Sequence, residues 1–381
     1  TYVKKAVSLA EGINSYTVEF TPDPDYKPGE YEQLSSYDTV VFQHNVIHKT
    51  YDRSILYVSP DGTQDGTGSK NNPLDIYTAV KFVQPGQKIV LKGGKYNLSN
   101  TVVVERGING TADNMIYLIA DPNSTERPVF DFGKQCAGMT FAGDYWYIKG
   151  FDVTNSADGT KGVQLSGDYC VLDSVNAYYN GNTGIQISRY LSTDLYEDWP
   201  AHNLVLNCTS YGNADKGYED ADGFAAKITV GDGNVFDGCI AYNNADDGWD
   251  LFAKVETGPI GKVIIRNSVA YGNGYLPDGT NAGNGNGFKL GGSSITGYHE
   301  LINCVAFDNK AKGIDSNSCP DVQIYNCTSF NNGSSNVALY TNDATNTDFF
   351  ADGIISYRTA NKSVGENIKP KGNQDTSKIY R

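Results

Sequence analysis

The sequence predicts an all-β fold, a single-domain parallel β-helix of stacked coils, and two repeating patterns predict it. The first is a triplet of glycine, a large apolar residue and a third residue that is free to be polar. Its copies recur about every 30 residues, a period typical of solenoids, and begin at Gly184, Gly223, Gly248, Gly287 and Gly313. The second is a gap-free alignment of short segments in which an asparagine follows two residues after an aromatic side chain. Because each coil contacts only its neighbours, the 381 residues add coils rather than domains.

The repeated asparagines and aromatic residues are interpreted as scaffold. The asparagines are Asn180, Asn213, Asn244, Asn273, Asn309 and Asn332. Stacked asparagines hydrogen-bond one another at turns, and we expect the stacked aromatic side chains to fill the core. These two ladders therefore predict a fold and carry no chemistry.

The repeat divides the chain into three parts. Residues 1–50 show no repeat and are predicted to form an N-terminal extension packed on the solenoid. Residues 51–350 are predicted to form the β-helix, and residues 351–381 a final irregular coil or a polar tail.

Three short elements should open the β-helix. Residues 55–58 are expected to form a strand. Residues 75–83 have apolar side chains at helical spacing, which predicts a short amphipathic helix that caps the open end of the stack. Residues 88–91 should then begin the first coil.

Composition restricts the partners. The net charge of −14 disfavours nucleic acid and anionic membranes as partners. An anionic substrate could bind only where cations or basic side chains offset that charge locally. No stretch approaches the ~18 apolar residues that a membrane span needs. The chain begins at Thr1 without a visible signal peptide, which we interpret as a mature or trimmed product, consistent with secretion. A monomer is expected, because capped solenoids need no partner to cover their ends.

Four of the seven cysteines share one column, namely Cys208, Cys239, Cys304 and Cys327. Neighbouring side chains in a parallel, in-register column do not point at each other, so buried free thiols are favoured. Disulfides between Cys208 and Cys239 or between Cys304 and Cys327 are the alternative, because the coil spacing would tolerate them.

A cluster of four aspartates on two adjacent coils predicts a metal site. Asp222 and Asp247 hold equivalent places on adjacent coils, and Asp246 and Asp250 lie in the same turn as Asp247. Unpaired, these carboxylates would repel one another strongly, and a hard divalent cation would relieve the repulsion. Calcium tolerates irregular oxygen geometry better than magnesium, and no His or Cys joins the cluster to suit a transition metal. The alternative is a set of ordinary turn aspartates.

Lys289 lies one coil beyond Asp250 and should point outward, because Phe288 must face the core. A lysine beside carboxylate-bound calcium suits β-elimination on a uronic acid. In that reaction the lysine removes the C5 proton while the cation stabilises the enolate-like charge. Neighbouring carboxylates raise the pKa of a lysine, whereas a general base needs a lowered pKa. Metal charge on the Asp250 side would offset the effect of that carboxylate. It would not offset the effect of Asp315 on the other side. The alternative is a solvated lysine in a salt bridge with Asp250 or Asp315.

Two insertions, at 188–201 and 275–286, are expected to gather on one face as a binding site. The first holds residues that suit sugar binding by stacking or by pairing with a carboxylate: Arg189, Tyr190, Tyr196 and Trp199. The alternative is an aromatic loop packed on its own scaffold. Lys227, which follows the triplet of the Asp222 coil, either contacts a substrate carboxylate or is solvated.

At these residues the chain resembles polysaccharide lyase family nine, the calcium-dependent, pectate-lyase-like parallel β-helices. The resemblance covers about residues 55–340. The matching runs are 143–147, 221–224, 246–252 and the glycine-rich, lysine-containing run 283–292. It implies a right-handed β-helix, an extracellular or periplasmic setting, calcium ligands at Asp222, Asp246, Asp247 and Asp250, and a Brønsted base at Lys289. Trp249 departs from the more usual phenylalanine, at a core-facing position.

The function expected is therefore calcium-dependent cleavage of an acidic, pectic plant cell-wall polysaccharide by β-elimination. Homogalacturonan and the rhamnose–galacturonate backbone both present the required carboxylate, and the choice stays open. One alternative is a β-helical glycoside hydrolase that uses Asp222 and Asp247 as acid and base. Another is a non-catalytic carbohydrate-binding β-helix with structural calcium. Replacing Lys289 by alanine should abolish a lyase and barely affect the other two.

Overall fold

The structure is a computed structural model that describes residues 6–21, 38–342, 348–359, 365–368 and 379–380. Its contacts divide the chain into two units, Thr1–Asp52 and Arg53–Arg381. In the first unit β1 (Gly12–Phe20) pairs antiparallel with β2 (Val40–His48). The prediction that residues 1–50 pack on the solenoid stays a prediction.

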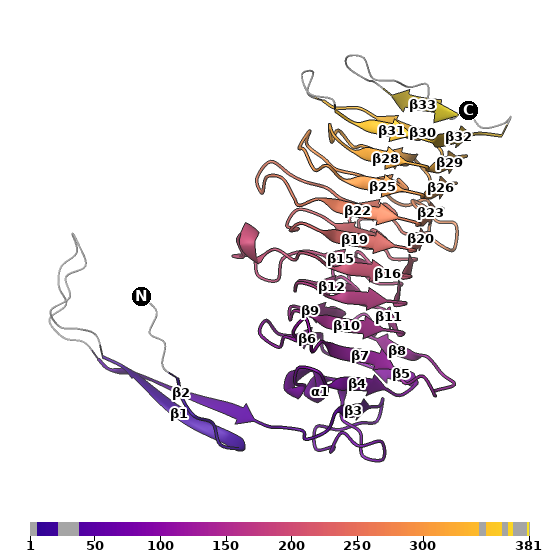
Figure 1. The fold of residues 1–381 in the computed structure, drawn as a ribbon. Helices are drawn as coiled ribbons and strands as arrows, with labels where there is room; N and C mark the ends of the chain where they lie inside the picture. The colour runs from indigo at the N-terminus through magenta and orange to yellow at the C-terminus, as the bar shows by residue number, and fades with distance from the viewer. Residues whose placement is uncertain (1–5, 22–37, 343–347, 360–364, 369–378, 381) are drawn as a thin grey trace, which may run out of the picture. The chain divides into compact units, whose positions relative to one another are not determined.

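The second unit is a parallel β-helix of three sheets, whose strands stack coil upon coil in Figure 1. The first sheet comprises β3 (Ile55–Val58), β4 (Lys88–Leu91), β7 (Ile116–Ala120), β10 (Trp146–Lys149), β13 (Val171–Asp173), β16 (Leu204–Leu206), β19 (Asn234–Asp237), β22 (Val263–Arg266), β25 (Glu300–Ile302), β28 (Gln323–Tyr325) and β31 (Phe350–Asp352).

The second sheet comprises β5 (Gly94–Asn97), β8 (Pro128–Asp131), β11 (Asp152–Thr154), β14 (Asn176–Tyr178), β17 (Thr209–Tyr211), β20 (Ile240–Tyr242), β23 (Val269–Tyr271), β26 (Val305–Phe307), β29 (Thr328–Phe330), β32 (Ile354–Tyr357) and β34 (Ile379–Tyr380). The third sheet comprises β6 (Val102–Val104), β9 (Met139–Phe141), β12 (Val163–Leu165), β15 (Ile185–Ile187), β18 (Phe224–Ala226), β21 (Trp249–Asp250), β24 (Phe288–Lys289), β27 (Lys312–Asp315), β30 (Ser335–Leu339) and β33 (Gly365–Ile368). The predicted all-β parallel β-helix is confirmed.

The predicted opening helix is α1 (Ile76–Phe82), which contacts β3 and β6. Asp75 caps its N-terminus, with the side-chain carboxylate accepting a 2.8 Å hydrogen bond from the Thr78 N–H. Ile76, Ala79 and Val80 are buried, as the helical spacing of apolar residues predicts. Among the described residues no helix is long and apolar enough to cross a membrane.

The asparagine ladder forms as predicted, with all six side chains buried. Asn213 donates from Nδ2 to Asn244 Oδ1 at 2.8 Å, and Asn244 donates to Asn273 Oδ1 at 3.0 Å. Each amide therefore satisfies its neighbour across a turn that lies inside the stack, where an unpaired amide would be costly.

The aromatic ladder does not fill the core, contrary to expectation. Tyr211 and Tyr242 stack at 4.8 Å between ring centroids, but each side chain in this ladder is only half-buried on the outer face of the second sheet. The inward position of each strand holds a small residue such as Ala241. The reason is close packing against the glycine triplets: a Cβ on Gly223 would lie 2.7 Å from Ala241 Cβ.

The core aromatic stack is instead the second residue of the glycine triplets. Phe224, Trp249 and Phe288 are fully buried, with centroid distances of 4.7 Å and 4.8 Å between successive rings. All seven cysteines are free thiols, which agrees with the favoured interpretation.

Candidate metal centre and catalytic site

The third sheet brings the predicted acidic residues into register. The residue before each triplet glycine forms a column, because each glycine N–H donates to the carbonyl of the equivalent residue on the next coil. Gly223 donates to Asp247 at 2.9 Å, and Gly248 donates to Asn286 at 2.8 Å. Asp222, Asp247 and Asn286 thus follow one another along the stack.

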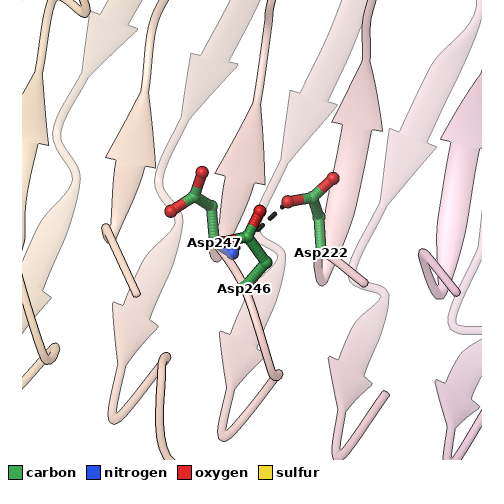
Figure 2. Close-up of side chains that lie close together, drawn as sticks. All are labelled: Asp222, Asp246 and Asp247. Atoms are coloured by element: carbon green, nitrogen blue, oxygen red, sulfur yellow. Dashed lines mark hydrogen bonds between the residues drawn. The ribbon is translucent and has the colours of Figure 1, made fainter. Parts of the chain in front are cut away.

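Three buried carboxylates converge at this point. One oxygen from each of Asp222, Asp246 and Asp247 lies within 4.8 Å of the others, and Figure 2 shows the three side chains on neighbouring coils. Asp222 Oδ1 accepts a hydrogen bond from the Asp247 N–H at 3.3 Å. Asp247 Oδ1 accepts from both the backbone N–H and Nδ2 of Asn286, at 2.7 and 2.8 Å, which fixes the orientation of that carboxylate.

Two lysines reach into the same cluster. Lys289 Nζ lies 3.1 Å from Asp247 Oδ2 and 3.4 Å from Asp250 Oδ2, and Lys227 Nζ lies 2.7 Å from Asp222 Oδ2 and 3.1 Å from Asp250 Oδ2. Both lysine side chains are largely covered, at 16% and 11% exposure. Asp250 pairs with both cations and lies outside the group of three, whereas the resemblance implied four ligands.

A tight backbone turn places Lys227. The Thr229 N–H donates to the Lys227 carbonyl at 2.8 Å, and Ile228 between them adopts φ 71°, in the left-handed region. A β-branched residue there is strained. The turn follows β18 directly and returns the Lys227 side chain to Asp222 on the same coil.

Burial dominates the electrostatics of the carboxylates. It raises the pKa of Asp222 to about 7 and that of Asp246 to about 9, and neighbouring aspartates add to both shifts. Burial by itself lowers the pKa of Lys289, but the carboxylates of Asp250 and Asp247 outweigh it and raise that pKa. In the metal-free protein the raised pKa values favour protonated, neutral carboxyls at Asp222 and Asp246, and a divalent cation would bind there in place of these protons.

The donor set fits a divalent cation. Asp247 Oδ2 is buried and makes no hydrogen bond, although Lys289 Nζ lies within ion-pair distance. The converging donors are all carboxylate oxygens, which hard cations such as Ca²⁺ prefer. Asp222, Asp246 and Asp247 are the residues that would hold such an ion.

The sequence left open how Lys289 could act as a base beside Asp315, and the structure shows that Asp315 is paired with another lysine. The two residues pair in register between β24 and β27, but Asp315 Oδ2 accepts from Lys312 Nζ at 2.8 Å. Lys312 precedes Asp315 by three residues on the same strand, where side chains usually alternate between faces, so the sequence does not reveal this pair. Asn286, also missed, occupies the same column as Asp222 and Asp247.

The first insertion forms a pocket beside the third sheet. The pocket has a volume of about 450 Å³, and its lining includes Arg189, Tyr196, Trp199, Glu256, Pro259 and Ile260. Trp199 is only 7% exposed and offers little ring face, whereas Tyr196 is 51% exposed. Tyr190 does not line it, because its hydroxyl donates to Glu105 Oε2 at 2.5 Å.

Comparison with known proteins identifies the family. The family model described as "Pel9A-like, right handed beta helix region" matches residues 56–347. The chain is 44% identical to pectate lyase L of Thermoclostridium stercorarium over 360 residues, which cover 94% of this chain and 28% of that protein. It is also 44% identical to pectate lyase L of Paenibacillus polymyxa (strain SC2), over 74% of this chain and 64% of that protein. The chain thus spans less than two thirds of either relative.

Solved structures agree. The crystal structure of pectate lyase Pel9A superposes with a TM-score of 0.71 at 34% identity, covering 85% of this chain and 79% of that one. A rhamnogalacturonan lyase shares the fold, with a TM-score of 0.70 at 23% identity over 86% of each chain. From the extent of the family match, the chain belongs to the Pel9A-like right-handed β-helix family.

Proposed function

We propose that this protein is a calcium-dependent polysaccharide lyase that cleaves galacturonate-containing pectic polysaccharide by β-elimination. The observation that carries the proposal is the convergence of three buried carboxylates with Lys289 on adjacent coils of the third sheet. Membership of a family whose named relatives are pectate lyases supports the same reaction class.

In the proposed reaction Asp222, Asp246 and Asp247 hold the cation. Calcium bound there supplies positive charge that neutralises the uronate carboxylate and stabilises the charge that develops at C5. Asp250, which the resemblance adds as a fourth ligand, holds Lys227 and Lys289 in place through its Oδ2 atom.

Lys289 is the proposed base. Its Nζ takes the C5 proton, and the freed electron pair forms the C4–C5 double bond of an unsaturated uronide. The C4–O glycosidic bond breaks, and the leaving oxygen keeps the electron pair of that bond and takes up a proton to become a hydroxyl. A base must be neutral to accept a proton, and Lys289 is held charged by Asp250 and Asp247. A cation held by Asp247 would offset one of these carboxylates and lower the pKa of Lys289, which favours the neutral form that a base requires.

We further propose an extracellular or periplasmic setting, a monomer, and an acidic plant cell-wall polysaccharide as the partner. The names of the relatives support the polymer. The net charge of −14 fits a protein that meets a polyanion only through bound cations and local lysines.

The test follows the near-ultraviolet absorbance of the new double bond with polygalacturonate, and separately with rhamnogalacturonan, each with calcium or with chelator. The proposal expects a rise with calcium that chelator abolishes, and the responding polymer identifies the backbone. New reducing ends without absorbance would instead indicate a hydrolase, and neither signal would indicate a non-catalytic binder.

A further inference from the structure

Lysines lie on both sides of the metal centre along the third sheet, and those on the N-terminal side differ from those on the C-terminal side in whether they have protein partners. The column of residues that precede the glycines extends from Asp222 towards the N-terminal coils through Thr183 to Lys161. It extends from Asp247 the other way through Asn286 to Lys312. A lysine therefore lies two coils beyond the aspartates on either side, about 10 Å away at the usual strand spacing.

On the C-terminal side the lysine side chains have ion-pair or hydrogen-bond partners within the protein. Lys312 Nζ lies 2.8 Å from Asp315 Oδ2 and 3.2 Å from the Tyr340 hydroxyl. Lys310 Nζ donates to two backbone carbonyls, of Ala282 and Gly283, at 2.6 Å each. These ammonium groups are already satisfied by the protein.

Lys161 on the N-terminal side is different. It is half-buried, yet no carboxylate of the described residues lies within 4.0 Å of its Nζ. Burial and repulsion from Lys227 both lower its pKa, with a smaller opposing effect of Asp220. Lys161 holds the same column position as Asp222, two coils closer to the N-terminus, which places it along the same line of the third sheet.

Two more polar side chains on the intervening coil lack partners. Gln186 pairs in register with Ala225 of the Asp222 coil and is 7% exposed, and its side-chain amide makes no hydrogen bond to the described residues. Arg189 follows β15 on the same coil, lines the pocket of the first insertion, and makes no side-chain ion pair within the described part of the chain. Buried or half-buried polar groups normally find partners, so these three are ready for a ligand that brings carboxylates and hydroxyls.

We propose that Lys161, Gln186 and Arg189 form a binding subsite for further uronate residues, on the N-terminal side of the metal centre. This inference rests on the proposed function and gives the bound polymer a direction: the chain extends from the metal towards β12. Lys161 and Arg189 bind carboxylates of that extension, and the Gln186 amide donates to a sugar oxygen.

The experiment compares wild type with Lys161→Met, on galacturonate oligomers of increasing length with calcium. The variant should raise KM about tenfold on long oligomers, the effect of losing one charge-assisted hydrogen bond, and leave kcat and the shortest cleaved substrates unchanged. Lys161→Arg should restore the long-oligomer KM. Lys70→Met, which removes the same charge from an exposed position on the opening coil, is the control. A KM that is unaffected on long oligomers, or a loss of kcat at every length, would overturn the subsite.

A binding measurement separates the two proposals. Titration calorimetry of a long oligomer into Lys289→Ala, with and without Lys161→Met, measures affinity without turnover. Wild-type elimination with no change in affinity on replacing Lys161 would refute the subsite alone. Binding that depends on Lys161 without any elimination would refute the lyase alone, and no binding would refute both.

Discussion

At the scale of single residues, the site combines buried carboxylates with two lysines that pair with them. Asp250 holds both Lys227 and Lys289, and the carboxylates of Asp222 and Asp247 each contact one of these lysines. Asp246 makes no ion pair within the described residues, and burial raises its pKa to about 9. A divalent cation bound there would replace the proton that this raised pKa favours.

Asp247→Asn should weaken calcium binding more than Asp250→Asn. Asp247 belongs to the converging group and has a buried oxygen without a hydrogen bond, whereas Asp250 lies outside the group. We expect losses of affinity of at least about a hundredfold and of about tenfold, respectively, in calcium titration calorimetry. Equal losses would mean that Asp250 is a direct ligand, as the resemblance implies.

Lys227→Met should destabilise the metal-free protein. It leaves the buried carboxylates of Asp222 and Asp250 without that cation, which costs about 3 kcal/mol of unfolding free energy. The loss should shrink when calcium is present. Denaturant unfolding with chelator and with calcium measures both values. The control is Lys149→Met, which breaks a half-exposed pair with Asp173 and should cost under about 1 kcal/mol. An equal loss for both variants would contradict the assignment.

His299 should make the fold acid-sensitive. Burial lowers its pKa from 6.5 to about 4, and Nδ1 accepts a hydrogen bond from the Val263 N–H. The unfolded chain binds the proton first, so stability falls as the pH drops from about 6.5 to about 4, by at most about 3 kcal/mol. The Asp321 carboxylate opposes the shift and Lys262 adds to it.

Stability measured against pH should therefore show a smaller slope over this window in His299→Gln than in wild type. An unchanged slope would mean that His299 does not carry the acid sensitivity.

At the scale of elements, the sequence predicts the register of the coils and the inward face of the third sheet, but not the inward face of the second sheet. The segments align without gaps, so the partners Asp250 and Lys289 follow directly and the structure pairs them. The pattern of a three-residue strand does not determine which of its faces points inward. The expectation that the aromatic ladder of the second sheet fills the core is therefore wrong. The decisive contact, between Gly223 and Ala241, joins two sheets and is not visible in either repeat.

The two ladders should therefore differ in stability. Asn244→Ala removes buried hydrogen bonds to Asn213 and Asn273 and should cost more than about 3 kcal/mol. Tyr242→Ala loses two outer ring stacks and should cost about 1 to 2 kcal/mol. Chemical denaturation of both variants measures the difference, and a larger loss for Tyr242→Ala would contradict the observed placement of the ladders.

At the scale of the whole molecule, the net negative charge limits where an anionic polymer can bind. A net charge of −14 repels a polyuronate, so the proposed binding face is the part of the third sheet where Lys227 and Lys289 lie beside the proposed cation site. The repeat predicts that face, because residues in one column share it. It does not predict that Lys227 turns back onto Asp222, since this depends on the strained turn at Ile228. Nor does it predict which lysines are already paired, since Lys312 and Lys161 occupy the same column.

The most direct test of the central claim is the rate of double-bond formation on polygalacturonate by wild type and by Lys289→Ala, at saturating calcium. The account predicts that the variant loses at least about a thousandfold in kcat. It also predicts that the variant binds calcium at least as tightly as wild type, because a competing cation has left the carboxylates. Retained elimination by a variant that still binds calcium would show that Lys289 is not the base and would contradict the mechanism.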